Sequence, residues 1–478
     1  MSKAKKQILF VASEAAPFIA TGGLADVIGS LPKALAESKR FDVRVVLPLY
    51  EDIKAECRKE FRYLGNINVR LAWRNQYCGF FEYKKDGVTF YFVDNEYYFK
   101  RHGCYGYLDD GERFAFFCKS ALELMGFIGF YPNVLHCHDW QAALAAIYLK
   151  TYYCHRMEYS NVKAMFTIHN IEYQGKYSLD ILEDVFDISN AHRYLVEYDG
   201  GINLMKGAIE CCERVSTVSP SYAEEIKYWY FAHGLDPIIR RNESKLRGIL
   251  NGIDFDYYNP LTDKALFANY SAENVSNKDV CKQQLQSMLN LPVKPNTPIV
   301  AMITRLASHK GLDLVRAVIE EAVSSEDMQF VLLGTGEREY EGFFTDLAAR
   351  YPDKVRAIIA FNGELSRKIY SGADMFLMPS KSEPCGLSQM IASRYGAVAI
   401  VRETGGLQDS IVPYGAGGNG FTFHNYNAHD MLHVLREAIA VYRNKQQWSA
   451  LVFKAMTSDF SWSKSAKNYA ETYLEMIK

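Results

Sequence analysis

The chain has 478 residues, of which 49% are hydrophobic and 23% are charged, and its formal net charge is -2. This length predicts two to four domains with ordinary packed cores, because domains average roughly 100–200 residues. The nearly balanced charge excludes a broad electrostatic attraction to nucleic acid or to an anionic membrane.

The sequence also limits the compartment in which the protein works. No run approaches ~18 consecutive apolar residues, so no membrane-spanning segment is predicted. The basic start is followed by Ile8–Ala12, an apolar run that is too short for a signal peptide and is ended by Glu14. The cysteines are scattered without a Cys-x-x-Cys pair, which indicates reduced thiols rather than a disulfide framework or a zinc site. We therefore expect a cytoplasmic protein.

In the first half of the chain, apolar runs typical of buried parallel strands alternate with helical patterns. Between residues 69 and 94 the pattern becomes aromatic and β-branched, and Lys84–Gly87 has the composition of a hairpin turn. This part is predicted as an antiparallel excursion from a parallel sheet. The strands expected here are Ile8–Ser13, Val43–Pro48, Val69–Trp73, Cys78–Tyr83, Val88–Val93, Val134–Cys137, Lys163–Ile168 and Val215–Val218, with helices from about Leu24, Arg113 and Met205 and after Ser219.

A second strand–helix series begins at Pro298, after a long polar stretch, Asn259–Lys278. Two such series predict an α/β protein with two Rossmann-like domains that face each other across a cleft. The expected bounds are 1–245, 246–455 and a C-terminal helix in 456–478 that packs back on the first domain. The strands expected in the second series are Ile299–Ile303, Gln329–Leu333, Val355–Ala360, Asp374–Pro379 and Ala397–Val401.

The stretch Ser380–Gln389 combines features of a ligand-binding loop. It follows a predicted buried strand and precedes a predicted helix, and it contains Glu383 and a tight Pro-Cys-Gly turn. Ligands of open α/β sheets bind at the carboxyl ends of strands, and helix N-termini favour anionic groups. An ordinary loop with a surface glutamate would have the same local sequence, so the functional interpretation depends on similar placements elsewhere.

Polar or aromatic residues follow several other predicted strands. Arg305 and Lys310 bracket one loop, and two cations beside a helix start suit a diphosphate. Phe361 could stack on a nucleobase, although a core position is the commoner fate of Phe. His169 could bind a sugar hydroxyl or be a structural histidine, and Asp139 with Trp140 joins a carboxylate to a ring that could stack on a sugar.

A short sequence is repeated in the two halves of the chain. Thr21–Asp26 and Thr404–Asp409 both contain Thr-Gly-Gly-Leu, and both follow a predicted strand and open a predicted helix. Glycines at such positions let backbone N–H groups approach a ligand closely. Neither segment matches Gly-x-Gly-x-x-Gly, and a P-loop, a metal-ligand spacing and a Gly-x-Ser-x-Gly elbow are missing from the sequence. A dinucleotide enzyme and a P-loop NTPase are therefore unsupported.

Together these stretches resemble one family. The chain is similar to the bacterial glycogen synthases and plant starch synthases, which are retaining glucosyltransferases that use ADP-glucose. The resemblance implies a GT-B fold with the active site between the domains, and no metal or other cofactor. The matching segments, in family order, are Thr21–Val27, His136–Gln141, Thr167–Asn170, Tyr173–Gly175, Gly248–Asp254, Arg305–Asp313, Pro379–Leu387 and Thr404–Leu407.

The resemblance also implies a role for each matching residue. ADP-glucose is the expected donor, and glycogen or a malto-oligosaccharide is the expected acceptor. The implied catalytic residues are His169, Arg305, Lys310 and Glu383; the implied donor-binding residues are Gly22, Gly23, Asp26, Asn170, Asn251, Phe361, Cys385, Gly386, Leu387 and Ser388; the implied acceptor-binding residues are Asp139 and Trp140.

One position departs from the family pattern. Ala20 stands where the family usually has a lysine, in the motif Lys-x-Gly-Gly-Leu, and that lysine is expected near the donor phosphates or the acceptor. Lys33 is a candidate substitute. The departure leaves two alternatives open: a retaining transferase with another donor, such as UDP-glucose, and a glucan-binding homologue without catalysis.

Overall fold

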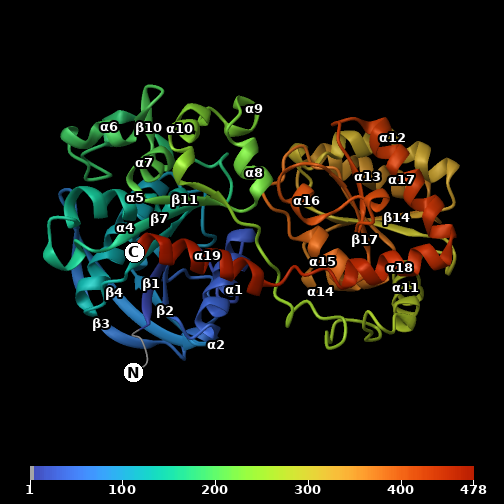
Figure 1. The fold of residues 1–478 in the computed structure, drawn as a ribbon, viewed down its shortest axis with the longest axis horizontal. Coiled ribbons are helices and arrows are strands. Elements are labelled where there is room, and N and C mark those ends of the chain that lie inside the picture. The colour runs from blue at the N-terminus through green and yellow to red at the C-terminus, as the bar shows by residue number, and fades with distance from the viewer. Residues whose placement is uncertain (1–4) are drawn as a thin grey trace. The chain divides into compact units, whose positions relative to one another are not determined.

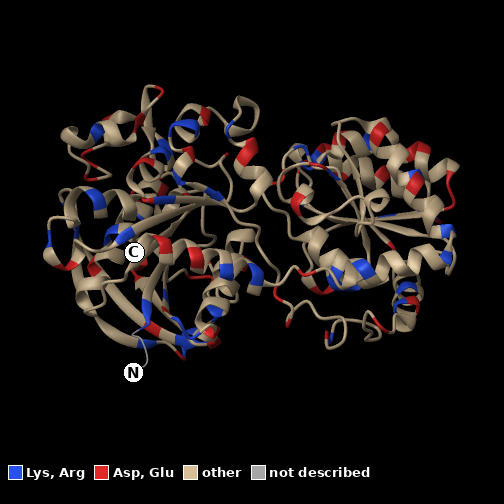
Figure 2. Ribbon diagram, in the orientation of Figure 1, with Lys and Arg blue, Asp and Glu red and all other residues tan. Residues whose placement is uncertain are grey.

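A computed structural model describes residues 5–478 (Figure 1). Lysine and arginine are interspersed with aspartate and glutamate throughout the ribbon (Figure 2). None of the helices within the described residues is long and apolar enough to cross a membrane.

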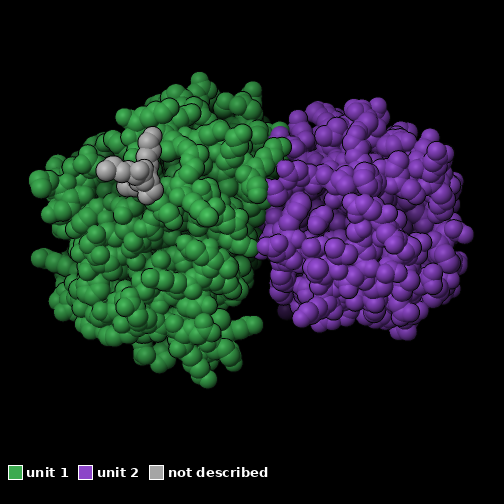
Figure 3. Space-filling model, turned by 60° about the horizontal axis from the view of Figure 1, so that its bottom comes forward, with its two compact units in different colours: residues 1–252, 462–478 green, residues 253–461 purple. Residues whose placement is uncertain are grey.

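The chain forms two compact units (Figure 3). Unit 1 runs to Gly252 and includes the C-terminal segment Trp462–Lys478, and unit 2 is Ile253–Ser461. The division thus falls at Gly252 rather than at the expected residue 245, and the returning segment begins at Trp462 rather than at residue 456.

Unit 1 is built on a nine-stranded sheet with the order β12-β11-β7-β6-β1-β2-β5-β4-β3. The strands from β12 to β5 are parallel, whereas β4 and β3 are antiparallel additions at one edge. The bounds are β1 Lys6–Val11, β2 Phe41–Pro48, β3 Arg62–Leu71, β4 Arg74–Lys85, β5 Val88–Asp94, β6 Val134–His138, β7 Lys163–Ile168, β11 Arg214–Thr217 and β12 Leu246–Gly248. A small second sheet contains β8 Lys176–Tyr177, β9 Glu197–Tyr198 and β10 Gly201–Asn203.

The antiparallel excursion is smaller than the sequence predicts. β5 pairs antiparallel with β4 on one side but parallel with β2 on the other, so it belongs to the parallel sheet. The predicted turn joins β4 to β5, where Asp86 and Gly87 have φ of 51° and 76°. Two positive φ values suit the type I′ turn, whose twist matches that of the flanking strands.

The helices of unit 1 pack around its sheet (Figure 1). Pro32 lies inside the first of them, which remains one helix from Gly23 to Glu37. The bounds are α1 Gly23–Glu37, α2 Ala55–Arg58, α3 Glu96–Phe99, α4 Asp110–Phe127, α5 Asp139–Tyr148, α6 Arg193–Val196, α7 Leu204–Cys211, α8 Pro220–Glu225, α9 Trp229–Ala232, α10 Asp236–Arg241 and α19 Trp462–Ile477.

Unit 2 has a six-stranded, entirely parallel sheet with the order β15-β14-β13-β16-β17-β18. β13 and β14 are almost completely buried, as expected for strands covered on both faces. The strands are β13 Ile299–Ile303, β14 Gln329–Gly334, β15 Val355–Ile359, β16 Met375–Met378, β17 Val398–Arg402 and β18 Phe421–Phe423. The helices are α11 Ser276–Met288, α12 Leu312–Ser325, α13 Arg338–Arg350, α14 Gly363–Gly372, α15 Ser388–Arg394, α16 Gly405–Ser410, α17 Ala428–Arg443 and α18 Lys445–Met456.

The C-terminal helix α19 is an integral part of unit 1. It contacts α1 and β6, and Ser465 donates a hydrogen bond to the carbonyl of Leu250. The hydroxyl of Tyr473 lies 2.7 Å from Nδ1 of His136, and both side chains are fully buried. A buried polar pair of this kind fixes the helix in one position, because either group would be costly to leave unpaired.

We predict that Tyr473→Phe destabilises unit 1 by about 1–3 kcal/mol, since it leaves a buried nitrogen of His136 without a partner. The measurement is thermal unfolding followed by calorimetry. Tyr194→Phe is the matched control, because the Tyr194 side chain is exposed and the same atom is removed in water. Equal unfolding temperatures for the two variants would contradict the prediction.

Candidate functional site

In each unit, the sequence-predicted site residues gather at the carboxyl edge of the parallel strands. Strands that run in the same direction end at the same edge, so the loops that follow them are neighbours. In unit 2, Arg305 and Lys310 follow β13, Phe361 follows β15 and Glu383 follows β16. In unit 1, Gly22 and Gly23 follow β1, Asp139 and Trp140 follow β6, His169 and Asn170 follow β7, and Asn251 follows β12.

Lys310 and Glu383 form the central contact of unit 2. Nζ of Lys310 lies 2.7 Å from Oε2 of Glu383, and the two side chains are only 18% and 9% exposed. Ser380 donates a second hydrogen bond, of 3.0 Å, to the same carboxylate oxygen. The pair leaves the ammonium group with further donors, so it can hold an anion while its position is fixed.

Gly311 allows the loop that contains Lys310 to pack closely against the loop that contains Glu383. Gly311 directly follows Lys310 and has φ of 74°, and a Cβ at this position would lie 2.0 Å from the carbonyl oxygen of Pro379. The N–H of Lys381 also donates to the carbonyl of His309 at 2.9 Å. Only glycine permits this approach without moving the strand end that leads to Glu383.

The backbone conformation of Gly386 and the side chain of Gln389 fix the turn that follows Glu383. Gly386 has φ of 69°, and the amide of Gln389 donates to the carbonyls of Cys385 and Gly386. The helix α15 starts at Ser388, so the first N–H groups of that helix have no acceptor within it. These groups, together with Leu387 as the N-cap residue, follow Glu383 closely in the sequence.

The two Thr-Gly-Gly-Leu segments differ in what surrounds their glycines. A Cβ at Gly22 or Gly23 would meet nothing within 4 Å. A Cβ at Gly405 would lie 2.1 Å from the carbonyl oxygen of Glu383, and one at Gly406 would lie 2.2 Å from that of Cys385. The interpretation that both segments approach a ligand therefore fits only the first, whereas the second packs against the loop of Glu383.

Glu14 is a functional candidate that the sequence interpretation missed. Its carboxylate is buried and accepts the N–H of Thr21 at 2.5 Å. Burial raises the pKa of Glu14, and the hydrogen bonds from Thr21, Tyr105 and Gly22 counteract part of that rise. Glu14 therefore holds the loop of Gly22 and Gly23 in place. Its position, next to the end of a buried strand, was the available signal.

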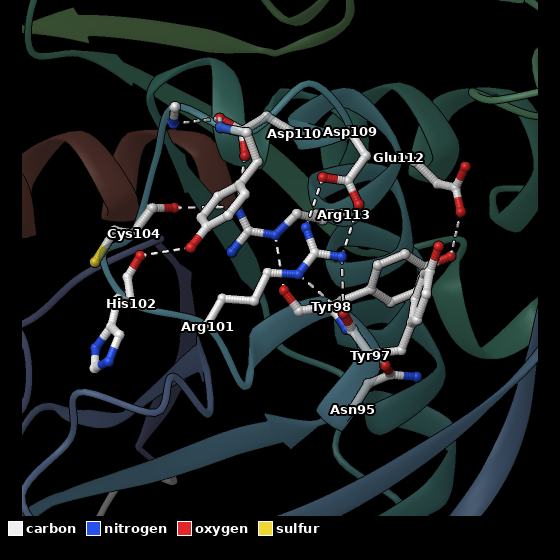
Figure 4. A network of polar contacts seen from close by, with 12 residues as sticks. Asn95, Tyr97, Tyr98, Arg101, His102, Cys104, Asp109, Asp110, Glu112 and Arg113 are labelled. Carbon is white, nitrogen blue, oxygen red and sulfur yellow. Dashed lines mark hydrogen bonds and ion pairs between the residues drawn. The ribbon is translucent and has the colours of Figure 1, made fainter.

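The loop that supplies Tyr105 is itself shaped by a buried arginine (Figure 4). Arg113 is fully buried on α4, donates to the carbonyls of Tyr98 and Cys104, and pairs with Asp110 at 2.5 Å. The other oxygen of Asp110 accepts the N–H of Gly106 at 2.8 Å. The hydroxyl of Tyr105 then lies 2.7 Å from that of Ser13, next to Glu14.

A hydrogen bond links the side chain of Asp139 to the backbone of His169. Oδ1 of Asp139 accepts the N–H of His169 at 2.8 Å, and Asp139 has φ of 55°, in the left-handed region that few non-glycine residues adopt. Burial raises the pKa of Asp139 to about 7 and lowers the pKa of His169 to about 3. His169 is therefore neutral at physiological pH. Backbone strain beside perturbed pKa values is typical of functional sites.

The remaining predicted residues have varied surroundings. Trp140 lies against Gly175 and in edge contact with Phe114, so it forms part of an aromatic wall. Oδ1 of Asn251 is buried without a partner among the described residues. Phe361 is 95% exposed, which excludes the core alternative.

Arg305 is exposed, and Asp26 is half-buried in the first turn of α1. Lys33 is a poor substitute for the lysine replaced by Ala20. It lies ~15 Å along the α1 axis from Gly23. It lines a small cavity with Lys85 and Phe90 instead. Within the described residues, no group of three or more histidine, cysteine or acidic side chains is arranged to hold a metal ion.

Known families match both units. Residues 7–241 match the model of the starch synthase catalytic domain, and residues 287–450 match that of glycosyl transferases group 1. The glycogen synthase of Desulforamulus reducens is 47% identical over 476 residues, which cover 98% of this chain and 99% of that protein. The glycogen synthase of Clostridium botulinum is 48% identical with the same coverage.

Two solved structures have the same fold. The catalytic domain of starch synthase IV from Arabidopsis thaliana, bound to ADP and acarbose, has a TM-score of 0.91 at 33% identity and covers 99% of this chain and 100% of that one. The sucrose-phosphate synthase of Thermosynechococcus elongatus has a TM-score of 0.62 at 16% identity, with 99% of both chains covered, and supports the fold alone. The chain therefore belongs to the family of glycogen and starch synthases and has the GT-B fold of glycosyltransferases.

Proposed function

We propose that the chain transfers glucose from ADP-glucose to the non-reducing end of an α-1,4-glucan with retention of configuration, and releases ADP. The observation that carries this proposal is the Lys310–Glu383 pair at the carboxyl edge of unit 2. A cation held by a buried carboxylate is already in place before the substrate binds. Such a group stabilises charge that develops on a leaving phosphate without reorganising during the reaction.

The surroundings of this pair suit a nucleoside diphosphate. Arg305 is exposed in the same loop as Lys310, and the N–H groups at the start of α15 lie next to Glu383 in sequence. The exposed ring of Phe361 offers a stacking surface for adenine. The starch synthase IV structure contains ADP, which supports the same nucleotide for this chain.

Unit 1 supplies groups suited to sugars. His169 and Asn170 would bind the glucose of the donor, and Asp139 and Trp140 would bind the acceptor. The acceptor is glycogen or a malto-oligosaccharide, and the acarbose bound to starch synthase IV supports a glucan-like ligand. The open space over Gly22 and Gly23 leaves their backbone accessible to the donor phosphates.

The carboxylates favour front-face attack by the acceptor over a covalent glucosyl intermediate. Glu14 and Asp139 accept backbone N–H groups, and Glu383 is paired with Lys310. One oxygen of each carboxylate is thus engaged in a positioning contact, which supports direct attack by the acceptor. Because Arg305 and Lys310 neutralise the diphosphate, we propose that no metal is required.

The proposal is tested by ADP or UDP release during glucosyl transfer to glycogen, with ADP-glucose and UDP-glucose compared in the presence of EDTA. We expect turnover that prefers ADP-glucose. We also expect Glu383→Gln to lower kcat/KM about 30–5,000-fold, since loss of one partner of a buried charge pair costs ~2–5 kcal/mol.

The matched control is Glu339→Gln, which breaks an exposed ion pair with Arg316 and should change kcat/KM little. Turnover only with UDP-glucose would support the alternative donor. Glucan binding without turnover from either donor would support a non-catalytic homologue.

We predict that Gly22→Ala raises the KM for ADP-glucose about tenfold or more without loss of stability. Gly22 has φ of -165°, which any residue adopts, and its added methyl group meets no protein atom, so only a ligand would collide with it. The control is Gly342→Ala in α13, where a Cβ also meets nothing. An unchanged KM for Gly22→Ala would show that the donor does not approach this loop.

We predict that Ala20→Lys lowers the KM for ADP-glucose by about 10–150-fold. Ala20 is exposed beside Thr21, whose N–H is held by Glu14, and one charge-assisted hydrogen bond to a phosphate is worth ~1.5–3 kcal/mol. Saturation kinetics at low ionic strength measure the change. An unaltered KM would indicate that the site of this chain compensates for the missing lysine in another way.

A further inference from the structure

Two buried histidines lie beneath the candidate site of unit 1 and have no role in the proposed reaction. His136 and His138 are separated by one residue on β6, so their side chains lie on the same face of the sheet. Both are fully buried. Phe10 of β1 stacks on His138, with ring centroids 5.4 Å apart and planes inclined by 13°. The ring of His138 is therefore fixed by packing.

The two histidines differ in how their ring nitrogens are paired. His136 has a partner at each nitrogen, the Tyr473 hydroxyl at 2.7 Å and the Thr167 hydroxyl at 2.6 Å. His138 has one partner: its Nδ1 lies 2.9 Å from Nε2 of His169. Its Nε2 is buried without a partner among residues 5–478.

The unpaired Nε2 of His138 indicates which ring, His138 or His169, donates the hydrogen bond between them. A neutral imidazole carries one proton. If His138 carried it on Nε2, a buried N–H donor would be left without an acceptor, and such orphaned donors are rare in folded proteins. If His138 carries it on Nδ1, that N–H donates to His169, and only a bare lone pair remains unpaired. The second arrangement is therefore favoured.

The state of His138 determines that of His169. Since Nε2 of His169 accepts the hydrogen bond, the proton of a neutral His169 must be on Nδ1. The described part of the chain gives this Nδ1 no hydrogen-bond partner, and His169 is half-buried rather than enclosed. Burial also lowers the pKa values of His136, His138 and His169, so the chain of rings is neutral near pH 7.

We infer that His138 is a positioning residue that holds His169 in its Nδ1–H tautomer, so that His169 presents a neutral hydrogen-bond donor to a hydroxyl oxygen of the bound sugar. The sugar as ligand rests on the proposed function, whereas the tautomer does not. His169 then binds and orients the sugar and does not act as a general base, since its only unprotonated ring nitrogen is occupied by His138.

The tautomer can be measured in the full chain labelled with ¹⁵N-histidine, because protonated and bare ring nitrogens differ strongly in chemical shift. The signals of His169 are identified by their loss in His169→Gln. We expect a protonated Nδ1 and a bare Nε2. A proton on Nε2 would overturn the inference, whether or not the protein transfers glucose, so this result is independent of the proposed function.

The role of His138 is tested by His138→Asn and His138→Leu, which have nearly the same shape. Only asparagine places an N–H donor at the position of Nδ1. We expect His138→Asn to keep the wild-type tautomer of His169 and most of kcat/KM. We expect His138→Leu to give mixed tautomers and to lower kcat/KM about tenfold, the value of one hydrogen bond. Equal tautomers or equal activities in the two variants would overturn the inference. If His138→Leu does not fold, the wild-type spectrum and His138→Asn still decide.

Discussion

Buried or half-buried carboxylates hold the loops at the carboxyl ends of the strands, and the rest of the candidate site depends on them. Glu14 accepts the N–H of Thr21, Asp139 accepts that of His169, and Glu383 pairs with Lys310. Taking a carboxylate out of water costs several kcal/mol unless hydrogen bonds replace the lost solvation. Each loop therefore has one conformation in which its carboxylate is satisfied, and that conformation is set before any ligand arrives.

Glycines serve this arrangement in two different ways. At Gly311, Gly405 and Gly406 the missing side chain lets backbone segments of the protein touch one another, which fixes the position of Glu383. At Gly22 and Gly23 the missing side chain leaves open space. The same Thr-Gly-Gly-Leu sequence thus contributes rigidity in unit 2 and accessibility in unit 1. Only the surrounding atoms distinguish the two uses.

The sequence predicted the α/β class, both strand series and the strand-end positions of the site. The strands Lys163–Ile168 and Ile299–Ile303 have the predicted bounds, because buried parallel strands are continuous apolar runs. The sequence did not reveal the role of His138, because its partner comes from another strand end: His169 is 31 residues away. It did not reveal Glu14 because part of the surroundings of that residue comes from Tyr105, whose contact with Ser13 spans 92 residues. Pairings over such distances follow from the sheet order, which local patterns do not specify.

The two units also differ in the kind of polar group that they offer. Unit 2 presents cations, Arg305 and Lys310, at its strand ends, whereas desolvation keeps His169 of unit 1 neutral. A departing diphosphate gains negative charge and is best stabilised by cations, but a sugar hydroxyl needs only hydrogen bonds in a defined direction. If His169 binds the donor sugar as proposed, its protonation would add a positive charge that a hydroxyl group does not need. Under the proposed function, its contact with a row of neutral rings can therefore be understood as part of the chemistry and not only of the packing.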